Sequence, residues 1–168
     1  MDKELITILD HRQIANKLKR LAWQIYENNM DEATLWIAGI DKRGIYLSGK
    51  IAAELAHISN QKIHMMKVLI DRQSYEPTYM SEHHIEELKD GVLILIDDVL
   101  NTGKTIISAM LPLIPKQVRR IHVAVLASRS HRLFPVKADY VGISMATTLQ
   151  EHLLFDNADE NDLKLVLT

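Results

Sequence analysis

The chain has 168 residues, of which 47% are apolar and 25% are charged, an ordinary composition for a globular protein. We expect one domain over residues 1–168, because this length suffices for one sizeable core. The lack of cysteine excludes a disulfide framework and a thiolate metal site, and the net charge of −2 argues against a polyanion as the main partner. No secretory signal and no apolar run of membrane-spanning length stand out, so we expect a cytoplasmic protein without a membrane partner.

Strands alternate with helices along the sequence. A helix is expected over residues 10–25, because Asp10 and Gln13 fit a capping box and apolar residues follow at helical spacing. The remaining expected elements are strands at 34–38, 62–70, 92–96, 121–127 and 138–142, an edge strand at 163–167, and helices at 45–56 and 104–114. Residues 71–90 are polar and carry Pro77, which indicates a long loop or partly helical flap. The alternation predicts an α/β fold: a mainly parallel twisted sheet, helices on both faces and a flexible flap.

Residues 92–105 are the most informative stretch. An apolar strand ends in Asp97 and Asp98, and residues 101–105 then form a turn that opens a helix. Such sheets bind ligands beyond the carboxyl ends of their strands, and backbone N–H groups at a helix start attract anions. Two carboxylates repel a bare phosphate but suit sugar hydroxyls or Mg²⁺, which together indicate a ribose phosphate. A nucleoside-triphosphate P-loop would need glycine where Asp98 stands, and a plain strand end with a helix cap is the other alternative.

This stretch resembles the phosphoribosyl-pyrophosphate (PRPP) motif of type I phosphoribosyltransferases. The resemblance implies that Asp97 and Asp98 hold the ribose hydroxyls, directly or with Mg²⁺ bound through PRPP, and act in catalysis with Arg72. It also implies a loop around the 5′-phosphate, made by Asn101, Thr102, Gly103, Lys104 and Thr105.

Two further segments fit this interpretation. The turn after the first buried strand contains Asp41, Lys42, Arg43 and Gly44, and the resemblance assigns pyrophosphate binding to it; a solvated turn is the alternative. In the flap, Arg72 and the pair Ser74 and Tyr75 would reach the pyrophosphate when a lid closes; a disordered surface loop is the alternative.

The histidine pair His83 and His84 could indicate a metal. Adjacent residues do not face the same way, and no third ligand is spaced nearby in the sequence, so we interpret both as solvated surface histidines.

The expected base site follows the strand at 121–127. The resemblance places Ser128, with its neighbour Arg129, and the later pair Leu149 and Gln150 around the base. Purine enzymes of this kind carry Asp at the Asn101 position and Lys at the Ser128 position, and both are missing here. These departures disfavour a 6-oxopurine.

Longer stretches resemble the family of pyrimidine operon attenuation regulators: ILDHRQIANKLKRLAWQIYE, GIDKRGIYLSGKIAAEL, LIDDVLNTGKT and SRSHRLFPVKADYVG. This resemblance implies transfer of the phosphoribosyl group from PRPP to a nucleobase, uracil, with leader mRNA as a further partner and a homodimer or higher homo-oligomer. Two alternatives stay open. One is a purine phosphoribosyltransferase, favoured by Ser74 and Tyr75. The other is an RNA-binding attenuator with vestigial catalysis, supported by Arg12, Lys17, Lys19, Arg20, Arg119 and Arg120.

Overall fold

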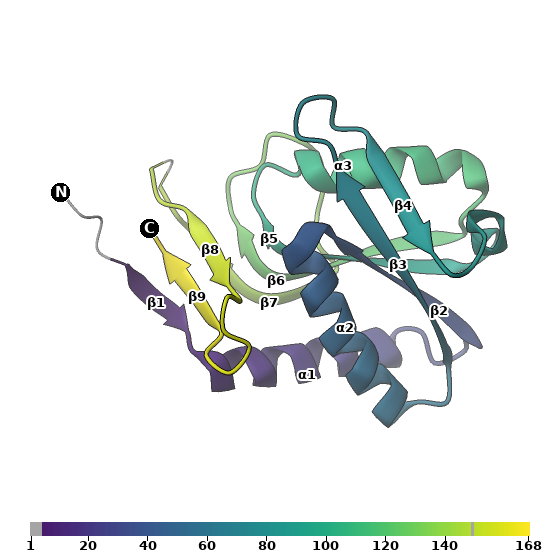
Figure 1. Cartoon of the computed structure of the whole chain (residues 1–168), viewed down its shortest axis with the longest axis horizontal. Helices are drawn as coiled ribbons and strands as arrows, with labels where there is room; N and C mark the ends of the chain where they lie inside the picture. The colour runs from purple at the N-terminus through teal and green to yellow at the C-terminus, as the bar shows by residue number, and fades with distance from the viewer. Residues whose placement is uncertain (1–4, 149) are drawn as a thin grey trace.

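Two β-sheets organise the chain in the computed structural model, which describes residues 5–148 and 150–168 (Figure 1). The strands are β1 (Ile6–Leu9), β2 (Thr34–Ile40), β3 (Lys62–Ile70), β4 (Pro77–Ser81), β5 (Val92–Leu100), β6 (Arg120–Arg129), β7 (Tyr140–Met145), β8 (Leu153–Asp156) and β9 (Lys164–Leu167). The α-helices are α1 (His11–Glu27), α2 (Asp41–Ile58) and α3 (Lys104–Met110), and the short 3-10 helices are η1 (Ile85–Leu88) and η2 (Leu111–Lys116). None of the helices in the described part of the chain has the length and apolar character needed to span a bilayer.

The larger sheet has the strand order β4-β3-β2-β5-β6-β7 and is parallel except for β4. The predicted, mainly parallel sheet is therefore confirmed. β2 and β5 are neighbours at its centre, with Gly39 opposite Ile96. Because parallel strands point the same way, the carboxyl ends of β2, β5 and β6 meet at one edge of the sheet.

Both faces of this sheet are covered, as predicted. Successive side chains of a strand point to opposite faces, so Leu35 and Ile37 pack with α1 and α2, whereas Trp36 and Ala38 pack in a second core with α3. Figure 1 shows α1 and α2 on one side of the strands and α3 on the other.

The predicted start of α1 is also confirmed. The Gln13 backbone N–H donates to Asp10 Oδ1 at 2.8 Å, and the Asp10 backbone N–H donates to Gln13 Oε1 at 2.9 Å. This reciprocal pair satisfies groups at the helix start that would otherwise lack partners.

The smaller sheet has the antiparallel order β1-β9-β8 and was not anticipated. The prediction of an edge strand at 163–167 is wrong, because β9 pairs on both sides, with β1 and with β8. Leu153, Phe155 and Leu165 of this sheet join the core under α1 and α2. The sheet therefore packs as part of the main body rather than as an appendage.

The segment predicted as a long flexible flap contains regular structure. β4 pairs with β3 from Met66 opposite Ser81 to Ile70 opposite Pro77, which leaves a hairpin loop of residues 71–76. The Tyr79 hydroxyl donates to the carbonyl of Ala109 at 2.7 Å, and burial raises the pKa of Tyr79 to about 12. Pro77 indicated a loop, but proline is tolerated at the first position of an edge strand.

Candidate active site

A cavity of about 750 Å³ lies at the edge of the sheet where β2 and β5 end. The turn after β2 and the β3–β4 hairpin contribute the predicted residues Asp41, Lys42, Arg43 and Arg72. β5 and the loop after it contribute the predicted residues Asp97, Asp98, Asn101 and Thr105. Three segments that are far apart in the sequence thus meet around one space that is large enough for a small organic ligand.

The two acids at the end of β5 have different surroundings. Asp97 is buried, and its Oδ1 accepts a hydrogen bond from the Asp98 backbone N–H at 2.9 Å. Burial, together with the charge of Asp98, raises the pKa of Asp97 well above its usual range. Arg43 and Asp98 both line the cavity, and Arg43 Nη1 lies 3.8 Å from Asp98 Oδ2. A cation or a set of hydroxyl donors placed here would stabilise the charged form of Asp97.

The loop of residues 101–105 turns sharply into α3. Gly103 has φ of +88°, a left-handed conformation that favours glycine, and a Cβ there would lie 3.3 Å from the Phe134 carbonyl oxygen. A small pocket of about 50 Å³ is lined by Asp97, Thr102, Gly103 and Thr105, among others. The loop therefore encloses a pocket about the size of a phosphate group, directly beside the acid pair.

The turn after β2 is the first turn of α2, which begins at Asp41 rather than near residue 45. Asp41 has φ of +52°, and its carboxylate accepts hydrogen bonds from the Ile70 backbone N–H at 3.0 Å and from the Arg72 guanidinium. Gly44 is buried: a Cβ there would lie 2.6 Å from the Ile96 carbonyl oxygen. This close backbone approach brings the start of α2 against the end of β5, so Gly44 has a packing contact and does not line the cavity.

The hairpin loop carries the predicted pair Ser74 and Tyr75. Asp71 Oδ1 accepts hydrogen bonds from the backbone N–H groups of Gln73 and Ser74 and from the Ser74 hydroxyl, and these bonds lower the pKa of Asp71. Lys104 Nζ lies 3.7 Å from the centre of the Tyr75 ring, a cation–π contact. Tyr75 therefore touches the loop at the start of α3, whereas the Ser74 hydroxyl is engaged within the hairpin.

Arg129 organises the end of β6. It is buried and donates to Thr147 Oγ1 at 2.6 Å, to Asn101 Oδ1 at 3.2 Å and to the Thr148 carbonyl at 2.8 Å. The neighbouring Ser128 is also buried, and its hydroxyl accepts from Arg132 at 2.6 Å. Of the other two predicted base-site residues, Gln150 is exposed in the turn before β8, and Leu149 lies outside the described residues.

Sequence reasoning missed several residues of the site. Leu153 and Asn157 line the cavity from β8 and the turn after it, and Leu69 lines it from β3. Thr147 is buried as a partner of Arg129. Of these, only the Thr147 contact could have been anticipated from the sequence, because the arginine that ends the buried strand β6 needs hydrogen-bond acceptors nearby. The others depend on how the smaller sheet packs.

A mainly parallel sheet with a cavity at its carboxyl edge defines an α/β protein in which small ligands have their usual place beyond the strand ends. The sequence model of the phosphoribosyl transferase domain matches residues 5–152, and the chain therefore belongs to the phosphoribosyltransferase family. It is a PRPP-dependent transferase.

Known proteins similar to this chain agree with that assignment. Bifunctional protein PyrR of Clostridium acetobutylicum is 34% identical over 152 residues, covering 86% of this chain and 85% of the relative. Bifunctional protein PyrR of Bacillus subtilis is 31% identical over 168 residues, covering 93% of each chain. A crystal structure of the hypoxanthine phosphoribosyltransferase of Trypanosoma cruzi has a TM-score of 0.77 at 14% identity, covering 95% of this chain and 94% of that one. This last likeness shows the shared fold.

Proposed function

We propose that this transferase moves the 5-phosphoribosyl group from PRPP to uracil, giving uridine 5′-monophosphate and pyrophosphate. The observation that carries the proposal is the cavity in which the acid pair of β5 faces Arg43, beside the small pocket of the 101–105 loop. The similarity to the PyrR relatives supports uracil as the acceptor.

In this proposal three sets of residues around the cavity bind three parts of PRPP. The loop of residues 101–105 holds the 5′-phosphate, Asp97 and Asp98 hold the ribose hydroxyls, and Lys42, Arg43 and Arg72 bind the pyrophosphate. The C1′–oxygen bond breaks with its electron pair going to pyrophosphate, and N1 of uracil forms the new bond to C1′ while its proton leaves to water. Positioning and charge supply most of the rate, because no strong nucleophile is required of the protein.

The acid pair also fits a magnesium ion. Mg²⁺ is commonly bound by one or two carboxylates together with substrate phosphates, and the buried Asp97 beside Asp98 is a pair whose repulsion a cation relieves. When bound, Mg²⁺ would neutralise charge on the pyrophosphate. Asp97 and Asp98 are the residues that would hold it.

Asn101 and Ser128 support uracil over a 6-oxopurine. The Asn101 carbonyl oxygen accepts from Arg129, which leaves its amide N–H groups to donate to a carbonyl oxygen of the base. Asn101 cannot accept a proton in catalysis, and Ser128 brings no cation to a 6-oxo group.

The proposal is tested with a panel of uracil, hypoxanthine, guanine and xanthine, each with PRPP and Mg²⁺. We expect release of pyrophosphate and formation of the nucleotide with uracil, and a loss of uracil turnover in Asn101→Asp, which sets a carboxylate against the uracil carbonyl. The conservative Thr102→Ser variant, which alters the same loop but keeps a hydroxyl, is the control for a general effect of substitutions in this loop. Turnover of purines alone would overturn uracil and leave the purine alternative, for which the Ser74 and Tyr75 pair is the sequence support.

RNA binding is a second proposed function, and the similarity to bifunctional relatives favours it. Three of the candidate cations are already engaged: Arg119 and Arg120 both bond Glu32, and Arg20 donates to the carbonyls of Val141 and Gly142.

The helix α1 offers the remaining RNA surface. Arg12, Lys19 and Trp23 are exposed and lie on one side of α1 by their spacing, which combines phosphate contacts with a stacking platform. We expect binding of leader RNA in the presence of uridine nucleotide, and a salt slope lowered by about 1–2 in Arg12→Ala/Lys19→Ala. The control is Lys50→Ala on α2. An unchanged affinity and slope in the double variant would exclude α1 as the RNA surface.

The proposal includes a homodimer or higher homo-oligomer, as the resemblance implies. Sedimentation equilibrium between micromolar and millimolar protein tests it, and a monomer over that whole range would contradict it.

A further inference from the structure

Three potential metal ligands from separate elements meet near the amino-terminal end of β3. His64 lies in β3, His83 in the turn after β4, and Glu87 in η1. One ligand atom from each lies within 4.8 Å of those of the other two. From this geometry we propose a site for a divalent transition-metal ion, of which Zn²⁺ is the type.

The sequence around His83 and His84 did not indicate a metal site, because the ligands that join His83 lie in β3 and η1. The adjacent His84 takes no part in the cluster, as expected for neighbouring residues. The missing ligands are supplied by β3, which comes earlier in the chain, and by η1, one helical turn later.

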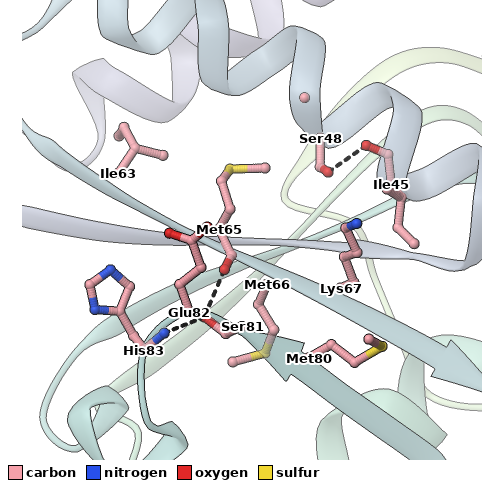
Figure 2. Close-up of a pocket in the computed structure, with 11 residues that line it drawn as sticks. Ile45, Ser48, Ile63, Met65, Met66, Lys67, Met80, Ser81, Glu82 and His83 are labelled. Atoms are coloured by element: carbon pink, nitrogen blue, oxygen red, sulfur yellow. Dashed lines mark hydrogen bonds between the residues drawn. The ribbon is translucent and has the colours of Figure 1, made fainter.

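The Ser81 hydroxyl links the backbone at His83 to the strand that carries His64. Ser81 Oγ donates to the carbonyl of Met65, the residue after His64, at 2.8 Å, and accepts from the His83 backbone N–H at 3.2 Å. Figure 2 shows these two bonds, with His83 at one end of the pocket beside β3 and Lys67 toward the other end.

The carboxylate of Glu87 is oriented in a similar way. Glu87 Oε1 accepts from the His84 backbone N–H at 3.0 Å, and Oε2 lies 3.5 Å from His83 Nδ1. One carboxylate oxygen is thus fixed by the backbone while the other faces the imidazole, the arrangement that outer-shell contacts give to metal ligands.

His64 carries an uncompensated nitrogen. Its Nδ1 is buried and has no hydrogen-bond partner among the described residues. Burial and the proximity of His83 lower the pKa of His64. The two imidazole rings are stacked, with centroids 3.6 Å apart and planes at 8°. A bound ion needs converging lone pairs, so binding would turn one of the two rings out of the stack.

The ligand set selects the class of ion. Two imidazoles and one carboxylate with an open position suit Zn²⁺ and Co²⁺, whereas Mg²⁺ prefers oxygen ligands only. The site is also remote from the PRPP cavity. His64 is near the start of β3 and Ile70 at its end, about 20 Å apart at the usual rise of a strand. The ion would therefore fasten η1 and the end of β4 to β3 without contacting substrate.

Co²⁺ binding to chelator-treated whole protein tests the proposal, with visible absorption and Trp fluorescence as readouts. Trp36 lies edge-on to both rings, with its ring centre 4.9 Å from that of His64 and 5.8 Å from that of His83. In a Trp23→Phe background, which leaves Trp36 as the sole tryptophan, we expect one equivalent of Co²⁺ to give tetrahedral absorption bands and to quench the fluorescence.

Matched variants locate the ion. We expect His83→Ala and Glu87→Gln to weaken Co²⁺ and Zn²⁺ binding by at least about a hundredfold, since even outer-shell partners contribute about 10–100-fold. His84→Asn is the control and should bind as the parent does, because it keeps a polar cap on η1. Transferase activity with Mg²⁺ should persist in His83→Ala, which separates this test from that of the proposed function. Absence of the bands in the parent, or equal binding by His83→Ala, would overturn the site.

Discussion

Replacing Asp97 with asparagine should stabilise the free protein while it impairs the transferase. The asparagine side chain would keep the Oδ1 acceptor for the Asp98 backbone N–H and remove a buried charge. Burial and the charge of Asp98 raise the folded-state pKa of Asp97. Its stabilising contribution is therefore complete below the unfolded-state pKa and is lost as pH rises through the folded-state pKa.

The expected gain follows from this sign. At neutral to alkaline pH Asp97→Asn should be more stable by about 1–2 kcal/mol, within the usual range for relieving one unfavourable group, and the Tm should rise by about 2–8 °C for a chain of this length. The difference should shrink toward zero as pH falls to about 4, where the unfolded carboxyl is protonated as well.

Thermal unfolding followed by circular dichroism between about pH 4 and 8 measures the difference in Tm between Asp97→Asn and the parent over the pH range in which it should change. Steady-state kinetics measures the loss of transferase activity. In the proposed role of Asp97 as a ligand of ribose and Mg²⁺, loss of its charge should lower the activity by on the order of a hundredfold, as when one transition-state contact is removed. The control Asp31→Asn, in the exposed turn before β2, also removes one carboxylate charge and should change neither the Tm nor the activity. A Tm that drops at the alkaline end, or a gain independent of pH, would refute the reasoning.

Three further substitutions probe the packing around the cavity. Arg129→Lys replaces the planar guanidinium, whose Nε, Nη1 and Nη2 each serve one acceptor, with a single ammonium that cannot reach all three. It should lose about 2–4 kcal/mol in chemical denaturation and raise the KM for the base more than that for PRPP; equal effects on both KM values would contradict a role at the base. Tyr75→Ala should raise the KM for PRPP by about 2–5-fold, the size of an exposed cation–π contact, while Tyr75→Phe should match the parent. Gly44→Ala should lose about 1–3 kcal/mol and most activity, because its Cβ would lie 2.6 Å from the Ile96 carbonyl oxygen. Gly49→Ala in the same helix meets nothing within 4 Å and should be neutral or stabilising, so similar losses in both glycine variants would argue against the contact.

Local patterns in the sequence were sufficient for the central part of the fold. The apolar run before Asp97 predicted a strand buried on both faces, and β5 has that form. Its acid pair and the 101–105 loop lie at the sheet edge where parallel topology places them, and the turn after β2 reaches the same cavity. These predictions succeeded because each depends on residues that are close together in the sequence.

Predictions that depended on distant pairing were less successful. β4 looked like a loop because its partner, β3, supplies most of its hydrogen bonds and Tyr79 finds its acceptor on α3. β1 and β8 are four-residue strands that both pair with β9, and for β1 that pairing spans most of the chain. The histidine cluster illustrates the same limit, since the partner of His83 in space is not its neighbour in sequence.

The tight approach of Gly44 to Ile96 couples the start of α2 to the end of β5. In the proposed function the donor half of the cavity is built on two adjacent central strands and on this close backbone contact between Gly44 and Ile96. The proposed acceptor half depends on Arg129, Thr147 and β8, which lie further toward the periphery. A redesign of acceptor preference would therefore be directed at Asn101 and residues 128–157, while the turn after β2 and the acid pair of β5 are kept unchanged.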